Sequence, residues 1–205
     1  MNNKRLQGCT LISAMLLSVS AMAGETYDWR VSAALGYGSS SDFSAKAIEK
    51  ALASNDNVAQ ISNLENGDLA YAFWFGYQVS PYWELEVGYV NFGEREADFS
   101  TDGSASEQDV ALQMPISGDG LAWAVRPAIS FAERWSAYGR VGVLFWRGEQ
   151  TSGDYSHESK GTDLLLGAGV EFAISSQWLL GLGWDRAEFD GDANNMVTLA
   201  VSYRL

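Results

Sequence analysis

Two short polar motifs contain the residue types of catalytic or cation-binding sites. His157 and Ser159 lie two positions apart, and covalent hydrolases use such a base and nucleophile when an acidic residue orients the histidine. The run that begins at Asp190 starts like a calcium loop, but its sixth position is Asn195 instead of Gly and its twelfth is Val201 instead of Glu. We interpret the first motif as a histidine in a polar loop, with catalysis as the alternative. The second leaves only loose Ca²⁺ or Mg²⁺ association with acidic side chains.

The composition excludes several other kinds of site. The chain has 205 residues, one Cys, one His and a formal net charge of −13. A single Cys cannot form an internal disulfide, and a single His cannot supply an imidazole cluster for zinc or copper. Nucleic-acid binding needs clustered Lys and Arg, which this acidic chain lacks. We therefore predict no catalytic residues, no metal site, no cofactor and no nucleic-acid partner.

Six charged residues occur inside otherwise apolar stretches, where a charge is costly unless a partner of opposite sign lies nearby. Three are cations and three are anions, so they can neutralise one another as one charge network. The two glutamates that lie two positions apart share a strand face, and cations of the same network are their favoured partners rather than a substrate. The six residues are Arg30, Glu84, Glu86, Arg126, Arg140 and Glu171.

The stretches that carry these charges alternate in polarity with a period of two, which is the pattern of a β-strand with two different faces. Trp29, Val31, Leu35 and Tyr37, for example, share one face, while Gly, Ala, Ser and Arg occupy the other. Eight segments of about ten residues show this pattern. They are residues 29–38, 69–79, 83–89, 121–131, 135–145, 164–172, 178–184 and 197–205.

Short and long connections alternate between these segments. Residues 79–83, 131–135 and 174–178 each contain an apolar strand end, three turn residues and a Trp, so they predict antiparallel hairpins. The long connections hold most of the Asp and Glu residues; they are residues 39–68, 94–120, 147–162 and 185–195. This alternation predicts an up-and-down meander with all its long loops at one end. In the first loop, Ser44–Asn55 favours a short helix over the barrel mouth.

The chemistry of the two strand faces indicates which solvent surrounds the barrel. One face carries Leu, Val, Phe, Tyr and Trp, and the other carries Gly, Ala, Ser and the six charges. Small residues and paired charges suit a narrow lumen, while the apolar face suits lipid, in which a closed barrel satisfies every backbone hydrogen bond. We predict an all-β fold, an eight-stranded antiparallel up-and-down transmembrane β-barrel. The alternative is a soluble barrel with an aromatic-rich core.

Aromatic residues gather at the ends of the predicted strands. Membrane proteins place Trp and Tyr at the two lipid–water interfaces, so we interpret these residues as an aromatic girdle at each interface. One row consists of Trp29, Trp83, Trp135, Trp178 and Tyr203. The row toward the other end consists of Tyr37, Tyr89, Phe145 and Trp184.

Residues 1–23 have the features of a cleaved secretory signal. A basic start is followed by the apolar stretch Leu11–Val19 and by a small-x-small motif that ends at Ala23. The apolar stretch is too short for a comfortable membrane span. We therefore predict cleavage after Ala23 and a barrel domain over residues 24–205.

Five segments, in this order along the chain, resemble the transmembrane domain of the outer membrane protein A (OmpA) family. They are Gly76–Tyr82, Glu86–Tyr89, Tyr138–Arg147, Gly169–Ile174 and Val201–Arg204. The similarity runs from about Trp29 to the end of the chain. It implies an eight-stranded barrel in the outer membrane of a Gram-negative bacterium, with both termini in the periplasm. It also implies contacts with outer-membrane lipids and lipopolysaccharide, and recognition of the last strand, Val197–Leu205, by the barrel-assembly machinery.

Two departures concern the end of the chain. OmpA proteins continue into a peptidoglycan-binding domain, whereas this sequence stops at the last predicted strand, so we do not expect the wall-tethering role to carry over. The final residue is Leu205, where the family's assembly signal usually has an aromatic residue. The alternation of the last strand is nevertheless intact.

A third departure concerns the lumen, which in OmpA is closed by a charged plug that has been linked to gating. Three of the six charges match members of that plug, namely Glu86, Arg126 and Glu171. The strand expected to supply a further Arg has Gly181 at about that position. We therefore expect an altered plug in which Arg140 or Arg30 completes the network.

The resemblance and the residues together predict a small surface-exposed outer-membrane protein without enzymatic activity or a large pore. An eight-stranded barrel is only about wide enough for its own side chains. The acidic loops would offer contacts to a host, a phage or divalent cations. Two alternatives stay open: a narrow solute channel, and a lipid A-modifying enzyme, because the His157–Ser159 pair resembles the base and nucleophile of the outer-membrane lipid A deacylase.

Overall fold

The computed structural model describes residues 29–40, 45–53, 59–65, 67–94, 96–101, 106, 108–109, 116–152 and 155–205. The predicted signal and its cleavage point at Ala23 lie outside these residues. The regular elements are β1 (Trp29–Ser40), α1 (Ala45–Ala53), β2 (Ala59–Glu65), β3 (Gly67–Ser80), β4 (Trp83–Asn91), β5 (Glu96–Thr101), β6 (Ser117–Ser130), β7 (Trp135–Ser152), β8 (Tyr155–Ala173), β9 (Trp178–Phe189) and β10 (Asp192–Arg204).

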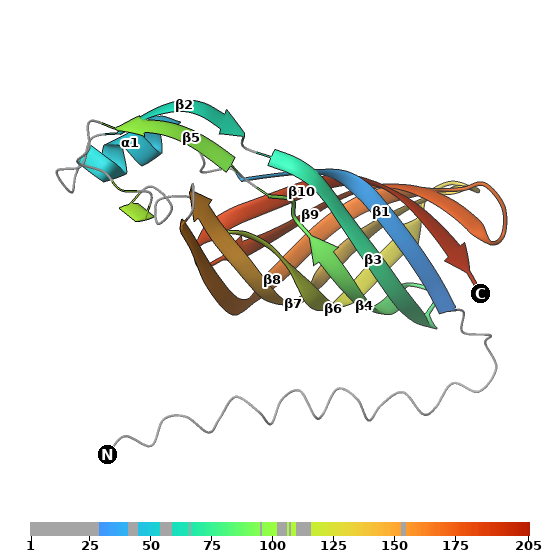
Figure 1. Ribbon diagram of the computed structural model, residues 1–205. Helices are drawn as coiled ribbons and strands as arrows, with labels where there is room; N and C mark the ends of the chain where they lie inside the picture. Colours follow the sequence, from blue (N-terminus) through green and yellow to red (C-terminus); the bar gives the residue numbers. More distant parts are fainter. Residues whose placement is uncertain are drawn as a thin grey trace, which may run out of the picture.

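Eight of these strands form one closed barrel (Figure 1). Their order around the barrel is β1-β10-β9-β8-β7-β6-β4-β3, and every neighbouring pair is antiparallel. The first and last strands close the ring, since β1 pairs with β10. The predicted eight-stranded antiparallel barrel is therefore confirmed. Strands β2 and β5 form a separate two-stranded sheet.

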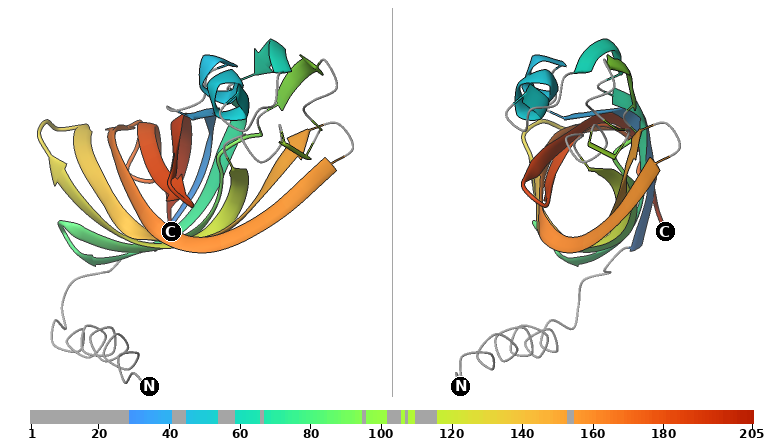
Figure 2. Two further views of the ribbon diagram at one scale, coloured as in Figure 1. Left: turned by 90° about the vertical axis from the view of Figure 1, so that its left-hand side faces the viewer. Right: turned by 60° about the vertical axis from the view of Figure 1, so that its left-hand side comes forward.

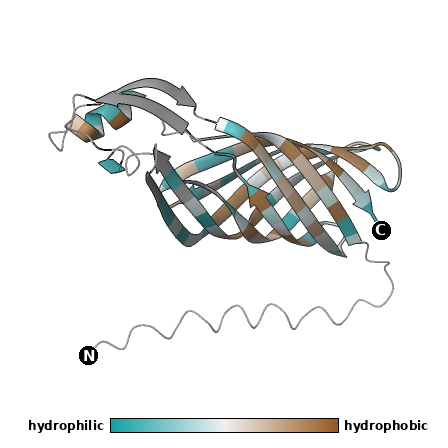
Figure 3. Ribbon diagram, viewed as in Figure 1, coloured by the Kyte–Doolittle hydropathy of each residue, from teal (hydrophilic) through white to brown (hydrophobic). Residues whose placement is uncertain are grey.

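The alternation of polarity becomes the difference between the outside and the inside of the barrel. Along β1, Val31, Leu35 and Tyr37 are exposed, whereas Arg30 and Ala34 are buried. The other barrel strands also expose large apolar side chains. In Figure 3 hydrophobic residues appear as brown patches that alternate with paler ones along the barrel strands. A soluble barrel would turn its apolar face inward. The orientation seen here contradicts that alternative and fits a lipid-facing wall.

The short connections lie at one end of the barrel as tight turns. In one of them the N–H of Ile174 donates to the carbonyl oxygen of Trp178 at 2.9 Å. Both barrel termini meet at the same end, where the N–H of Leu205 donates to the carbonyl oxygen of Trp29 at 2.8 Å. We call this the short-turn end and the opposite one the long-loop end.

Two of the connections predicted as long loops differ from that prediction because they consist mostly of strand. Residues 185–195 contain the end of β9, the start of β10 and the two-residue turn Asp190–Gly191. Strands β7 and β8 stay paired through most of residues 147–162, up to Ser152 opposite Tyr155. These ranges look like loops because a hairpin that projects beyond the lipid band needs no apolar face, and so shows no alternation.

The Asp190–Gly191 turn explains the motif that begins like a calcium loop. Both residues have positive φ, at 53° for Asp190 and 97° for Gly191. A two-residue hairpin of type I′ requires positive φ at both positions and favours Asp-Gly. The pair therefore serves the geometry of the β9–β10 hairpin.

Replacing Gly191 with Ala should lower the free energy of unfolding by about 1 kcal/mol, because a side chain is strained at this φ. No heavy atom lies within 4 Å of the position that the new Cβ would take, so strain is the only cost. The check is the urea concentration at which the folded gel mobility disappears. Gly139→Ala is the control, since its nearest contact would be an ordinary 3.6 Å. Equal losses in both variants would contradict the turn assignment.

Helix α1 and the β2–β5 sheet lie beyond the barrel wall at the long-loop end (Figure 2). The helix predicted within Ser44–Asn55 is confirmed over Ala45–Ala53. Its apolar side chains Ile48 and Leu52 are buried, and Lys46 is exposed. In the part of the chain that the structure describes, no helix combines the length and apolar character needed to cross a membrane.

Candidate functional site

The six charged residues singled out in the sequence all point into the barrel. They come from β1, β4, β6, β7 and β8. Side chains alternate between the two faces of a strand, so each of these residues, whose neighbours point outward, faces the lumen and is buried. A seventh charged residue from β9 joins them. The resulting charge cluster, which lies in the half of the lumen near the short turns, consists of Arg30, Glu84, Glu86, Arg126, Arg140, Glu171 and Asp185.

Glu86 is the centre of this charge cluster. The Arg140 Nε atom lies 2.7 Å from its Oε2, and the Arg30 Nη2 atom lies 2.8 Å from its Oε1. The Arg126 Nε atom is farther away, 3.7 Å from Oε1. One carboxylate therefore contacts all three guanidinium groups, which come from three different strands.

The remaining ion pairs connect the cluster across the lumen. Glu171 accepts a hydrogen bond from Arg30 at 2.9 Å, and its Oε2 atom forms an ion pair with Arg126 Nη2 at 2.7 Å. Glu84 lies 3.0 Å from Arg30 and 3.3 Å from Arg126. Since both also contact Glu86, Arg30 and Arg126 share the same three carboxylates. Because buried charges are stable only when paired, this arrangement links distant strands of the barrel.

Arg140 joins the cluster to β9 and to the aromatic side chains of the lumen. Its Nη1 atom lies 2.6 Å from Asp185 Oδ1, and its guanidinium carbon lies 3.9 Å from the centre of the Trp74 ring. Gly167 lies between Arg140 and Asp185 in the strand register, and a Cβ there would overlap the Asp185 carboxylate. A glycine on β8 therefore makes room for this ion pair.

Asp185 is the member that sequence reasoning missed. The polar composition of residues 185–195 predicts a loop there, but Asp185 continues the inward parity of Gly181 and Gly183 on β9. That parity is the signal that could have found it. At Gly181, where the OmpA resemblance predicts a further Arg, β9 has no side chain. Arg30 from β1 forms the ion pair with Glu171 in its place. Arg140 also joins the network, so both candidates named for completing it take part.

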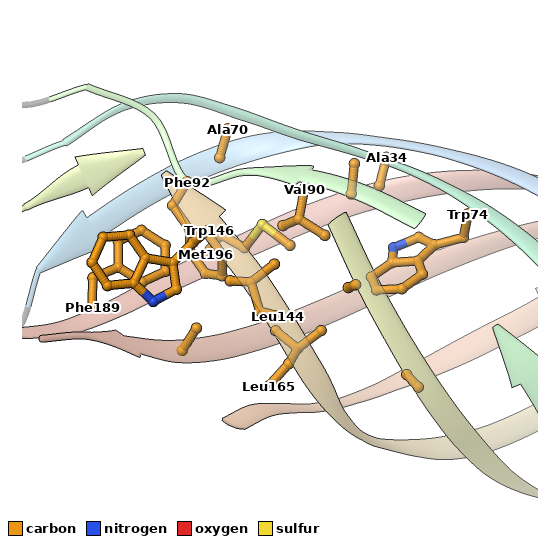
Figure 4. Close-up of a cluster of buried hydrophobic side chains, with 14 of the residues drawn as sticks. Ala34, Ala70, Trp74, Val90, Phe92, Leu144, Trp146, Leu165, Phe189 and Met196 are labelled. Atoms are coloured by element: carbon orange, nitrogen blue, oxygen red, sulfur yellow. The ribbon is translucent and has the colours of Figure 1, made fainter. Parts of the chain in front are cut away.

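Apolar side chains fill the other half of the lumen, toward the long-loop end (Figure 4). Phe189 stacks on Trp146 with ring centres 4.9 Å apart and meets Phe92 edge-on at 5.4 Å. The Trp146 Nε1 atom donates to Asp163 at 2.6 Å, which satisfies the one polar atom of its ring. Further buried members of this apolar plug are Val90, Leu144, Leu165 and Met196. The lumen is therefore filled at two levels, by the charge cluster and by the apolar plug.

The space left at the short-turn end is small. A cavity of about 80 Å³ lies next to the charge cluster and is lined by Arg30, Arg126, Glu171 and Arg204, among others. This volume holds a few water molecules and no solute of the size that porins pass. Among the described residues, no three His, Cys, Asp or Glu side chains gather in a way that could hold a metal ion.

The residues of the aromatic girdle lie on the outer face near both strand ends. At the short-turn end, Trp29, Trp83, Trp135 and Trp178 are exposed and Tyr203 is half-buried. Trp178 and Tyr203 are in contact, with ring centres 4.8 Å apart. Toward the long-loop end, Tyr37, Phe145 and Trp184 are exposed, and Tyr89 is half-buried with its ring centre 6.2 Å from that of Tyr71.

The His157–Ser159 pair lies on β8 within the projecting β7–β8 hairpin. His157 is opposite Gln150, Ser159 is opposite Gly148, and the histidine is exposed. Neither side chain has a hydrogen bond to an acidic side chain among the described residues. Within the described part of the chain, the pair therefore has no bonded acidic residue of the kind that orients the base in a nucleophile–base pair.

The closed eight-stranded wall, its apolar outer surface and its filled interior define a class of protein, the small transmembrane β-barrels. The family model described as "Outer membrane protein beta-barrel domain" matches residues 9–204, and the chain belongs to this family. The resemblance to OmpA is confirmed, and the protein is a small, surface-exposed barrel of the outer membrane.

Two curated relatives illustrate the extent of the likeness. Outer membrane protein A of Serratia marcescens is 26% identical over 145 residues, which are 64% of this chain and 38% of the relative. Outer membrane protein A of Escherichia coli O157:H7 is 27% identical over 138 residues, 63% of this chain and 37% of the relative. The chain thus matches less than half of the length of these relatives.

Among solved structures, the outer membrane protein OprG from Pseudomonas aeruginosa has the same fold. Its TM-score is 0.54 at 8% identity, and the match covers 87% of this chain and 97% of OprG. At this identity the likeness concerns the fold alone.

Proposed function

We propose that this barrel is a non-enzymatic, closed outer-membrane protein that supports the membrane and presents an acidic surface to the outside. The observation that carries the proposal is the double filling of the lumen. All seven side chains of the charge cluster form ion pairs across the lumen around Glu86, and the apolar plug around Trp146 fills the other half. A wall held so tightly by its own interior suits a structural role better than transport.

The acidic surface is formed by the segments at the long-loop end. Asp68, Glu94, Glu158 and Glu188 are exposed there. Nearby, the hydroxyl and the backbone N–H of Ser106 donate to Asp109 at 2.7 and 2.9 Å, which lowers the pKa of that carboxyl. Short turns face the periplasm and long loops face the exterior in outer-membrane barrels. We therefore assign contacts with a host, a phage or divalent cations to this end.

The closed lumen predicts an electrical result. Purified protein refolded into planar bilayers should show no porin-sized conductance, because both levels of the lumen are filled. Arg126→Gln and Glu171→Gln should also show no porin-sized conductance, since the apolar plug does not depend on these two residues. The narrow-channel alternative instead requires both charge changes to alter a measurable conductance. Porin-sized steps in the wild type would contradict the proposal.

The proposed lack of enzymatic activity predicts that the two residues of the His157–Ser159 pair do not affect lipid A. Cells that produce His157→Ala or Ser159→Ala should have the same lipid A mass spectrum as cells that produce the wild type, because no acidic side chain among the described residues bonds the histidine. Cells without the protein provide the reference spectrum. A lipid A species that appears with the wild type and disappears in either variant would identify an enzyme.

The proposal includes the route by which the protein reaches the membrane. Export through a signal cleaved after Ala23, recognition of Val197–Leu205 by the barrel-assembly machinery, and contact with lipopolysaccharide are all consistent with the family. Mass spectrometry of protein from outer-membrane fractions tests the cleavage, since the chain should begin at Gly24. A soluble periplasmic protein whose gel mobility does not change on boiling would contradict the whole assignment.

A further inference from the structure

A hollow of about 620 Å³ lies at the long-loop end, on the side of the barrel formed by β4, β6, β7 and β8. Its lining includes Asn91, Asp119, Arg147, Glu158 and Lys160. By strand parity these five side chains lie on the same face as the lipid-facing residues below them, not on the lumen face. The hollow therefore belongs to the outer surface of the barrel, where the apolar band ends.

Two cations stand next to each other in this hollow. Arg147 on β7 and Lys160 on β8 are opposite residues in the strand register. The Arg147 side chain is 80% exposed, and its one ion pair among the described residues is long, with Nε 3.5 Å from Asp119 Oδ2. Lys160 is exposed and has no ion pair within the described part of the chain. Their hydrogen-bond donors are thus available for a ligand.

The position of the two cations along the barrel axis indicates which part of a lipid they can contact. Strand β7 runs twelve residues from the girdle residue Trp135 to Arg147. At about 3.3 Å per residue and a tilt of about 40°, this is roughly 30 Å, slightly more than the ~25 Å apolar band of an outer-membrane barrel. Phe145, two residues before Arg147, is exposed on the apolar band. The cations therefore lie at the level of lipid headgroups.

We infer that this hollow binds the phosphorylated sugar headgroup of an outer-leaflet lipid, with Arg147 and Lys160 as the phosphate ligands. Guanidinium and ammonium groups bind phosphate through charge-assisted hydrogen bonds. The volume suits a sugar phosphate rather than a lone ion. The inference rests on the proposed outer-membrane placement and adds to it a specific lipid contact.

The carboxylates of the hollow determine how this binding depends on ions. Asp119, Glu158 and Glu94 line it together with the two cations, so the hollow is not positive overall. A phosphate held by Arg147 and Lys160 would lie near these carboxylates. A divalent cation that bridges phosphate and carboxylate relieves that repulsion. Mg²⁺ should therefore strengthen headgroup binding.

The test compares lipid retention by purified variants. Full-length protein is refolded into phosphatidylcholine nanodiscs that contain a small fraction of bisphosphorylated lipid A and Mg²⁺. The lipid A that stays bound after release into detergent is counted by native mass spectrometry. We expect the double variant Arg147→Gln/Lys160→Gln to retain roughly tenfold less lipid A than the wild type. When Mg²⁺ is left out, Asp119→Asn should retain more lipid A than the wild type, because it removes the carboxylate beside Arg147 that repels the phosphate when no cation bridges the two.

The control removes two cations from the same end of the barrel but away from the lipid level. Lys46→Gln/Lys50→Gln, on α1, should retain lipid A like the wild type. Lipid A without phosphates should bind the wild type and the double variant equally weakly. Unchanged gel mobility of each variant shows that the barrel is folded.

Three outcomes would overturn the inference: equal retention by the double variant and the wild type, an equal loss in the Lys46/Lys50 control, or undiminished binding of the phosphate-free lipid. The lumen recordings test the proposed function separately. A conducting barrel could still select the phosphorylated lipid, and a silent barrel could fail to do so.

Discussion

Arg140→Met is expected to lower the free energy of unfolding of the refolded protein by about 3–5 kcal/mol. Arg140 is buried and contacts Glu86, Asp185 and the face of Trp74. Methionine keeps most of the volume but none of the charge, so two carboxylates lose a partner inside the barrel. Unfolding in urea, followed by the loss of the folded gel mobility in lipid vesicles, measures the change.

Arg147→Met is the matched control for this prediction. It is the same substitution on the same strand, but its side chain is 80% exposed and its ion pair with Asp119 is long. Exposed pairs contribute about 0–1 kcal/mol. Adding Asp185→Asn to Arg140→Met should recover part of the loss by removing one unpaired carboxylate. Equal destabilisation by the two Met variants would show that the charge cluster does not hold the barrel together.

Trp146→Ala is expected to lower the free energy of unfolding by about 3–5 kcal/mol. The ring is buried in the lumen, stacks on Phe189 and donates to Asp163. Its removal leaves a cavity in the apolar plug and leaves the half-buried Asp163 carboxylate without this donor. The same urea series gives the change, and gel mobility is the preferred signal because the substitution alters tryptophan fluorescence.

Trp123→Ala provides the comparison between the inside and the outside of the same wall. Trp123 lies on β6 and is 64% exposed on the outer face. Lipid or detergent fills the space that its ring leaves, so no cavity forms and the loss should be clearly smaller than for Trp146→Ala. A larger loss for Trp123→Ala would mean that the lipid-facing surface, rather than the plug, dominates stability.

The fold could be predicted because two local properties are sufficient for it. The period-two alternation shows in each strand which residues face lipid, as in Val31, Leu35 and Tyr37 of β1. The short connections require antiparallel neighbours, and eight such strands close into a barrel. Both properties depend on residues adjacent in sequence. The projecting β7–β8 hairpin escaped prediction because outside the lipid both of its faces can be polar.

The candidate site could be predicted only in part. Parity places Arg30 and Glu171 on inward faces, but it does not say that they bond each other from 141 residues apart. That contact exists because the closed lumen is narrow enough for side chains from β1 and β8 to meet across it. Asp185 was missed because the polar composition of residues 185–195 resembles a loop, whereas the Asp190–Gly191 turn extends β9 past this position.

The sequence by itself determined the two faces of every barrel strand, the number of strands and the residue types available inside. These follow from covalent order and from the alternation of side chains along an extended backbone. Only the tertiary structure decided the partners: Glu86 among three guanidinium groups, Trp146 on Phe189, and Arg147 beside Lys160 at the lipid boundary. Strand register and barrel closure set these contacts, and no short stretch of the chain encodes either.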